Sequence, residues 1–519
     1  MPYNIRIVST YPPRKCGVGT FSRDLATALA HFTGEVGHIR VAAIDNGSGP
    51  YDIPVDLTID QYNPQSWRDV IMHISTRAAE AVNPTIVILQ HEYGLDPDKD
   101  GNDGQGTNFV ELAKAFTERG LTTLVYLHTV LDEPDPHQRK VLQDLAQFSD
   151  GLIVTTESAI AMLESSSYRI DPAKLKHIDH GIRMHHPSQY DRLAIKRRYG
   201  LENHFLVATL GLLSPDKGIQ YGIRAYGRFL DESCTEAQRK QIVYLIAGQY
   251  HPEFVKADGG RSYREFQDIL HKTLEDSRLR WCKVKEFGTT DFEQYDVVFL
   301  DAFLEETALL NLYGATNVMV LPYLNMQQIS SGILADTLGS GRAAIATKFR
   351  YAVELIHSNR PCPGGVVIGR HARGILVDSG EASVEQIAGA LDSLVFNPDK
   401  RLRMEKQAHQ RGYQMRWDNS AWALLQYIDF VREQKEIITG RGPRFVREKP
   451  SVLQLNKHRP TVNPPKAGAT TDPSPAGQTA LTAENAEIAE QKFRIVDAAP
   501  SDFDKLSGGA NSAVEDMSS

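Results

Sequence analysis

The sequence predicts an α/β protein with two Rossmann-like domains that face a central cleft, followed by a disordered C-terminal tail. Three observations support this fold class. Short β-rich apolar runs alternate with amphipathic stretches from residue 3 onward, the alternation restarts near residue 205, and the composition changes beyond residue 440. Such alternation is typical of parallel strands that are joined by crossover helices.

The first domain is predicted over residues 1–185, as an acceptor domain. Its strands are expected at Tyr3–Ser9, His38–Asp45, Thr85–His91, Thr122–His128, Gly151–Thr155 and Leu175–Asp179. Its helices are expected at Thr20–Ala30, Ser66–Ala81, Asn108–Arg119 and Pro136–Gln147. Strand and helix therefore alternate as in a doubly wound sheet.

The second domain is predicted over residues 186–412, as a donor-binding domain. Its strands are expected at Phe205–Gly211, Ile242–Gly248, Val318–Pro322, Ala343–Thr347 and Gly374–Asp378. Its helices are expected at Lys217–Leu230, Tyr263–Leu274, Asp301–Tyr313, Gly332–Leu338 and Val384–Val395. Two successive units of this kind fit two Rossmann-like domains.

The C-terminal region divides into a helix and a tail. Within residues 413–438, Trp422, Leu425, Ile428 and Val431 recur with a helical period, so this helix should pack back on the body of the protein. Residues 440–519 are rich in Pro, Ala, Ser and Thr, a composition that favours disorder.

Composition narrows the class of protein. A chain of 519 residues is too long for one hydrophobic core, and 41% hydrophobic with 24% charged residues is typical of a globular protein. The net charge of -8 argues against broad nucleic-acid binding. No apolar run approaches the roughly 18 residues of a membrane span, and no signal peptide precedes the first strand. We therefore expect a cytoplasmic protein without a transmembrane segment, for which peripheral membrane contact stays open.

Cysteines and acidic loops give no metal site. Cys16, Cys234, Cys282 and Cys362 stand far apart without a C-x-x-C pair, which indicates reduced thiols rather than zinc ligands. Asp96–Gly101 matches the opening of an EF-hand loop, but the twelfth position is Thr107 instead of the required Glu. We expect a polar loop there, placed as a lid over an acceptor, and no bound metal.

A glycine pair follows the first predicted strand. Gly17, Val18 and Gly19 open the next helix, where backbone N–H groups can approach a phosphate closely. The third glycine of a dinucleotide-binding fingerprint is absent, because position 22 is Ser. A tight strand-to-helix turn with no ligand is the alternative interpretation.

The second half carries two further candidate phosphate sites. Gly211 ends a strand and Lys217 precedes a helix, so this lysine could neutralise a diphosphate. Ser331 and Gly332 begin another helix, and Asp336 could accept hydrogen bonds from a ribose diol. The alternatives are a solvated lysine, a plain N-cap and a carboxylate that interacts with the helix dipole.

Histidines end two strands of the first domain. His91, followed by Glu92, and His128 lie where ligands bind in open parallel sheets, beyond the carboxyl ends of the strands. A buried structural histidine is the alternative for each of them.

Together these motifs resemble the retaining glycosyltransferases of family 4, which have the GT-B fold. The resemblance extends from Tyr3 to Gln434. It is most specific in the second half, at Leu210–Gly218, Ile246–Gly248, Asn311–Tyr323, Gln328–Asp336, Ala343–Thr347 and Gly374–Asp378.

The resemblance implies transfer of a hexose from a nucleotide-diphosphate sugar, with retention of configuration and without a cofactor. Lys217 would contact the diphosphate, Asp336 the ribose and Gln328 the sugar hydroxyls. Backbone amides near Gly332 and Ile333 would face the phosphate or the sugar. The acceptor could be a saccharide, a lipid-linked group or a small molecule.

The same resemblance assigns the first domain and the remaining glycines. The Gly17–Gly19 loop would close over the diphosphate, and His128 would lie near the anomeric carbon. His91 and Glu92 would lie on the acceptor side. Gly211 and Gly248 would line the donor site.

Three departures from the family pattern keep other functions open. Leu212 stands where an Arg is common, while Gln328 and Asp336 replace two glutamates. The alternatives are a disaccharide phosphorylase of similar fold, a nicotinamide-dependent dehydrogenase, and a catalytically silent protein that binds a nucleotide or sugar.

Overall fold

The computed structural model describes residues 3–33, 38–97, 105–183, 192–287, 290–357, 364–369 and 371–438. All of them belong to one compact unit, which spans Met1–Arg444. The predicted domain boundary at 185/186, Cys362 and the predicted tail at 440–519 lie outside the described residues. Among the described helices, none has the length and apolar character that a membrane span requires.

The first sheet contains seven strands among the described residues, in the order β3-β2-β1-β4-β5-β6-β7, and its recorded pairings are parallel. The strands are β1 (Asn4–Ser9), β2 (Ile39–Asp45), β3 (Val55–Asp60), β4 (Thr85–His91), β5 (Thr122–Leu127), β6 (Gly151–Val154) and β7 (Leu175–His177). The connecting helices are α1 (Gly17–Thr33), α2 (Pro64–Glu80), α3 (Thr107–Glu118), α4 (Pro136–Phe148) and α5 (Glu157–Glu164). The strand order reverses between β1 and β4.

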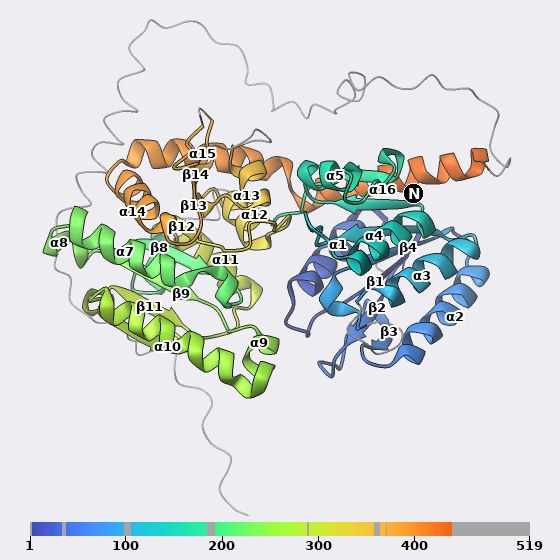
Figure 1. Cartoon of the computed structure of the whole chain (residues 1–519), viewed down its shortest axis with the longest axis horizontal. Helices are drawn as coiled ribbons and strands as arrows, with labels where there is room; N and C mark the ends of the chain where they lie inside the picture. The colour runs from blue at the N-terminus through green and yellow to red at the C-terminus, as the bar shows by residue number, and fades with distance from the viewer. Residues whose placement is uncertain are drawn as a thin grey trace, which may run out of the picture. The chain divides into compact units, whose positions relative to one another are not determined.

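The second sheet repeats this plan, with seven described strands in the order β10-β11-β9-β8-β12-β13-β14. The strands are β8 (Phe205–Leu210), β9 (Ile242–Ala247), β10 (Trp281–Val284), β11 (Val297–Leu300), β12 (Val318–Leu321), β13 (Ala343–Thr347) and β14 (Gly374–Val377). The helices are α6 (Arg192–Arg198), α7 (Ile219–Ser233), α8 (Glu236–Arg239), α9 (Pro252–Lys256), α10 (Arg261–Asp276), α11 (Glu306–Ala315), α12 (Gly332–Gly339), α13 (Arg350–Ala352), α14 (Ala382–Val395) and α15 (Pro398–Gln414). Here the order reverses between β8 and β12 (Figure 1).

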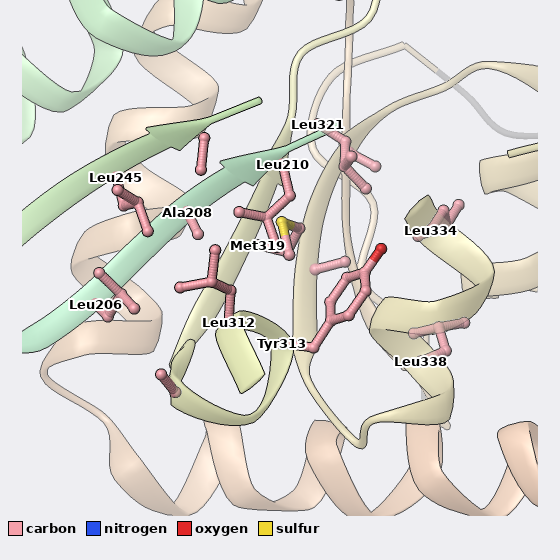
Figure 2. Packing of buried hydrophobic residues seen from close by; sticks show 14 of the residues in the cluster. Leu206, Ala208, Leu210, Leu245, Leu312, Tyr313, Met319, Leu321, Leu334 and Leu338 are labelled. Carbon is pink, nitrogen blue, oxygen red and sulfur yellow. The ribbon is translucent and has the colours of Figure 1, made fainter. Parts of the chain in front are cut away.

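Each sheet has a hydrophobic core on both faces. One face of the first sheet packs against α2, α3, α4 and α5, and one face of the second packs against α7, α10 and α14. The other face of the second sheet packs against α11, α12 and α15. Figure 2 shows this last core, where Leu312 of α11 lies near Leu206 and Ala208 of β8, and Leu334 and Leu338 of α12 lie on the far side of Tyr313. Such burial on both faces explains why the strands read as continuous apolar runs.

The remaining face of the first sheet is covered by α1 and by the last described helix, α16 (Trp417–Ile438). Trp417, Leu424, Ile428 and Val431 are buried among residues of β1 and α1, and Trp417 lies 4.9 Å from Phe21 between ring centres. Helix α16 therefore packs on the first sheet and on α1.

The structure differs from the predicted elements in specific places. Three strands were not predicted: β3 is partly exposed at a sheet edge, while β10 and β11 are only four residues long. Helix α15 was not predicted either, because it is too polar to show a clear hydrophobic period. Its start does carry local signals, since Asn397 caps it and Pro398 occupies its first turn.

Two predicted helices begin three or more residues away from their predicted starts. Helix α1 begins at Gly17 instead of Thr20, and α11 begins at Glu306 instead of Asp301. The second shift leaves residues 301–305 as a loop.

Candidate functional site

A cavity of about 970 Å³ lies where the carboxyl ends of strands from both sheets meet. It is lined by residues that follow β1, β4, β5, β8, β9 and β12. This is the place where ligands bind in open α/β sheets, next to the reversal of strand order. The lining contains twelve predicted site residues: Gly17, Val18, Glu92, His128, Gly211, Lys217, Gly248, Gln328, Ser331, Gly332, Ile333 and Asp336.

A second cavity, of about 130 Å³, lies near the amino ends of β1 and β2, with Arg6, Arg40 and Arg77 in its lining. It contains none of the predicted site residues.

Two glycines bring the ends of β8 and β9 into close contact. Gly211 has φ +116° and Gly248 has φ +150°, values that side chains rarely adopt. A Cβ added at Gly248 would come within 1.7 Å of the Gly211 carbonyl oxygen. The backbone can therefore form this part of the pocket wall only with glycine at position 248.

Lys217 lies in the short helical turn Pro215–Lys217, just before α7. Its Nζ is 4.1 Å from the centre of the Tyr323 ring and 3.5 Å from Oδ2 of Asp216. The next residue, Gly218, has φ +61°, and a Cβ there would meet the Pro322 carbonyl oxygen at 2.0 Å. The turn is thus held against the end of β12, and the ammonium group lines the cavity.

The amino end of α12 forms a second polar part of the same wall. Ser331 is the N-cap, and its Oγ accepts a hydrogen bond from the Leu334 amide at 3.3 Å. The amides of Gly332 and Ile333 belong to the first turn, where helix geometry leaves N–H groups without a helical acceptor. Gln328 precedes this turn, and its Nε2 donates to the Ser330 carbonyl at 2.6 Å. Its side chain is therefore fixed beside the helix start.

Asp336 lies one turn into α12 and also lines the cavity. Burial raises its pKa from 3.8 to about 7, and the nearby carboxylates of Asp24 and Glu306 act in the same direction. The Arg183 guanidinium opposes this rise, and the Arg183 amide donates to Oδ1 of Asp336 at 3.4 Å. Burial therefore favours the protonated carboxyl group well above the pH at which a free aspartate ionises.

Two arginines and two carboxylates form an ion-pair network beside Asp336. Arg183 Nε lies 3.0 Å from Asp24 Oδ2 and 3.3 Å from Glu306 Oε1. Arg23 Nη2 lies 2.9 Å from Asp24 Oδ1 and 3.0 Å from Glu306 Oε2. Asp24 belongs to α1 and Glu306 to α11, so the network joins the two halves of the unit at the pocket.

The two predicted histidines have different surroundings. His128 lines the pocket, and its Nε2 lies 2.7 Å from the side-chain oxygen of Gln90. His91 does not line the pocket: it is fully buried and packs edge-to-face on Tyr93 and Phe109. Burial lowers the pKa of both imidazoles to about 3. His91 is therefore a core residue, which corrects its prediction as an acceptor-side residue.

Glu92 lies in the pocket lining, as one of the acceptor-side candidates. Its Oε1 accepts from the Tyr93 amide at 3.0 Å and its Oε2 accepts from the Thr129 hydroxyl at 2.7 Å. Burial raises its pKa, and these two hydrogen bonds oppose the rise. The carboxylate is thus fixed next to Thr129 at the end of β5.

The glycine pair of the first half forms a helical turn, not a loop. Gly17 and Val18 line the pocket, whereas Gly19 is buried, and a Cβ there would lie 3.4 Å from the Tyr11 backbone. Gly19 thus allows α1 to pack closely on the segment after β1. This corrects the prediction that Gly19 takes part in a loop over the ligand.

Asp96 has a structural role. Its carboxylate accepts hydrogen bonds from the Asn108 side chain at 2.8 Å and the Phe109 amide at 2.9 Å, which fixes the start of α3. Residues 98–101 of the EF-hand-like segment lie outside the described residues. No cluster of three or more metal-ligating side chains occurs in the part of the chain that the structure describes.

Several pocket residues were not predicted from the sequence. They are charged or aromatic side chains of the first half, of the crossover segment that follows β7, and of α16: Arg14, Lys15, Arg23, Asp24, His180, Arg183 and Trp417. Lys15 Nζ lies 3.1 Å from the side-chain oxygen of Gln249 and 4.7 Å from the centre of the Phe303 ring. Lys15 begins the segment that contains the Gly17–Gly19 motif, whereas the others lie in helices or loops of ordinary composition that carry no local motif.

No family model matches the chain, and no curated protein matches it. Solved structures do. HepE from Anabaena, in complex with UDP, matches with a TM-score of 0.58 and 14% identity over 82% of this chain and 100% of that chain. A glycosyltransferase from Rickettsia africae matches with a TM-score of 0.57 and 11% identity over 83% and 100%.

An α,α-trehalose 6-phosphate synthase from Burkholderia multivorans matches with a TM-score of 0.57 and 13% identity over 86% of this chain and 100% of that chain. At such identities the likeness concerns the fold. The chain has the GT-B fold, with two parallel seven-stranded sheets among its described residues.

Proposed function

We propose that the chain is a family 4-type glycosyltransferase that moves a hexose from a nucleotide-diphosphate sugar to a hydroxyl acceptor, with retention of configuration. One observation carries the proposal: Lys217, the start of α12 and Asp336 line a single cavity at the strand ends of a GT-B fold. The HepE structures that resemble this fold contain UDP, UDP with glucose, and UDP-glucose, which supports a uridine nucleotide as the first ligand to test.

The second-sheet wall would bind the nucleotide diphosphate. The Lys217 ammonium and the amides of Gly332 and Ile333 supply positive charge and N–H donors, as a diphosphate requires. The ionised Asp336 can accept hydrogen bonds from both ribose hydroxyls. Gln328 would contact hydroxyls of the donor sugar.

Transfer breaks the bond between the anomeric carbon and the diphosphate oxygen. A bond forms between that carbon and the acceptor oxygen on the same face of the sugar. The proton of the acceptor hydroxyl passes to the departing diphosphate, so the nucleoside diphosphate leaves with the bond electrons and a proton. Lys217 and the α12 amides stabilise the charge that grows on the leaving group. His128 and Glu92 line the opposite wall, on the side proposed for the acceptor.

The compartment is part of the proposal. Cys16, Cys234 and Cys282 carry free thiols, which fits a cytoplasmic enzyme.

Thermal shift and turnover test the proposal. The purified chain is screened against UDP, GDP and ADP and their glucose or mannose conjugates. A binding donor raises the melting temperature by mass action, and donor hydrolysis or transfer is then followed by nucleotide release. Lys217→Ala should remove most of the turnover signal, while Lys140→Ala, on the exposed side of α4, should keep both signals. The proposal fails if none of these nucleotides stabilises the parent, or if a stabilising donor is neither hydrolysed nor transferred.

A further inference from the structure

His180 lines the pocket in the crossover segment that follows β7. Two aromatic residues hold its ring. Phe21 lies edge-on at 5.1 Å and Trp417 lies at 5.7 Å, both between ring centres. The ring is therefore fixed by packing from α1 and α16.

The tautomer of His180 follows from its one hydrogen bond. Nδ1 lies 2.6 Å from the carbonyl oxygen of Gly181. A carbonyl can only accept, so Nδ1 carries the proton and Nε2 presents a lone pair. Burial lowers the pKa of His180 to about 4, so the imidazole stays neutral at physiological pH. Within the described residues, no donor is recorded for Nε2.

Nε2 of His180 lies next to the start of α12. A Cβ placed on Gly332 would lie 3.8 Å from Nε2 and 3.9 Å from Cε1, so this edge of the imidazole ring borders the space next to Gly332. The first turn of α12, which begins at Gly332, carries N–H donors without a helical acceptor. A phosphate oxygen can bind the donors but cannot bind the lone pair. A group next to His180 must itself donate a hydrogen bond, as a sugar hydroxyl does.

We infer that His180 is a specificity-determining residue, whose Nε2 accepts a hydrogen bond from one hydroxyl of the donor sugar beside Gly332. The inference rests on the proposed function and deepens it, because it names the chemistry of the sugar. The donor carries a neutral sugar with a free hydroxyl at this point. A carboxylate or phosphate there would place acceptor oxygens against the lone pair, with no proton to share.

Three variants distinguish the effect of the Nε2 lone pair from the effect of ring packing. His180→Phe keeps an aromatic ring between Phe21 and Trp417 but removes the acceptor. His180→Gln places an amide oxygen close to the position of Nε2 and should restore most of the function. His31→Phe is the matched control, because its side chain is 67% exposed and His31 is absent from the pocket lining.

The probes are UDP, UDP-glucose and the UDP-glucose analogues that each lack one sugar hydroxyl. For His180→Phe we expect kcat/KM for UDP-glucose to fall about tenfold or more, because a site built for a hydroxyl loses its acceptor. The Kd for UDP should change by less than about twofold, since UDP has no sugar at this position. For the parent, kcat/KM for one deoxy analogue should be about tenfold lower than kcat/KM for UDP-glucose. For His180→Phe, the two values should be nearly equal.

The outcomes distinguish the two proposals. Equal loss of UDP and UDP-glucose binding in His180→Phe, or unchanged discrimination across the deoxy series, overturns the role of His180 alone. If the parent binds UDP but neither binds nor turns over UDP-glucose, the inference fails while nucleotide binding stands. If the parent binds neither compound, the inference for this sugar fails, and the wider nucleotide screen decides the proposed function.

Discussion

The two walls of the pocket are built in different ways. The second-sheet wall is organised by local backbone turns: the glycine turns at Gly211 and Gly248, the turn before α7 and the first turn of α12. The first-sheet wall consists of side chains from dispersed segments, among them Arg23 and Asp24 of α1 and His128 after β5. Under the proposed function, a wall organised by local turns would suit the diphosphate and ribose that nucleotide-sugar donors share, whereas a wall of dispersed side chains could vary with the acceptor.

The largest expected effect is loss of the one lysine in the second-sheet wall. Lys217→Ala should lower kcat by about 10²–10³-fold, because a cation aimed at the leaving group acts mainly in the transition state. Single-turnover kinetics with UDP-glucose measures this, with circular dichroism as the check on folding. Near-parental turnover would mean that the first-sheet arginines bind the diphosphate. The assignment of the diphosphate to the second-sheet wall would then be wrong.

The next effect concerns the second-sheet wall itself. Gly248→Ala should destabilise the chain by roughly 3 kcal/mol or more, because its Cβ would collide with the Gly211 carbonyl. Gly389→Ala in α14 is the control: nothing lies within 4 Å of its Cβ position. That change should stabilise the chain by about 0.5–1 kcal/mol. Urea denaturation compares the two, and equal stabilities would show that the turn is not constrained.

The third prediction uses the raised pKa of Asp336. UDP-glucose binding should tighten as pH rises toward 7 and level off above it, by up to about tenfold per unit below pH 7, because the carboxylate form accepts the ribose hydroxyls. Stability should change in the opposite direction: the folded carboxyl holds its proton to about 7, whereas the unfolded one ionises near 3.8, so stability falls as pH rises between these values.

Asp336→Asn should flatten both pH profiles, and calorimetry from pH 5.5 to 8.5 measures the binding profile. Burial is the main cause of this raised pKa, Asp24 and Glu306 add to the rise, and Arg183 opposes it. Because Arg183 lowers it, Arg183→Gln should move the midpoint to higher pH. A profile of Asp336→Asn that keeps the parental slope would assign the titration to another group.

The smallest expected effect comes from adding a cation to the second-sheet wall. Leu212 lines the pocket immediately after Gly211. Leu212→Arg should tighten UDP binding by roughly threefold to tenfold, with an advantage that shrinks as salt is added. Leu212→Gln controls for the change in polarity. Weaker UDP binding by the Arg variant would indicate that Leu212 packs against the nucleotide instead of standing beside its phosphates.

The same contrast explains what the sequence could predict. Gly211, Lys217 and Gly332 lie at strand–turn–helix junctions, which carry a local signature, and the structure brings all three to one cavity. His180 and Arg183 lie in a crossover segment with no such signature, and only long-range packing places them there. His91 was wrongly predicted to lie on the acceptor side of the site. Its strand is buried on both faces, and the sequence of such a strand does not reveal which residue reaches the ligand.

The packing of α16 on the first sheet has a consequence for biosynthesis. Residues of β1 and α1 share one hydrophobic cluster with the last described helix, so this cluster is completed only when nearly all of the preceding chain has left the ribosome. An isolated N-terminal half would leave the hydrophobic surface that α16 covers exposed to water. Expression trials of that half alone should yield aggregates unless the segment Trp417–Ile438 is supplied with it.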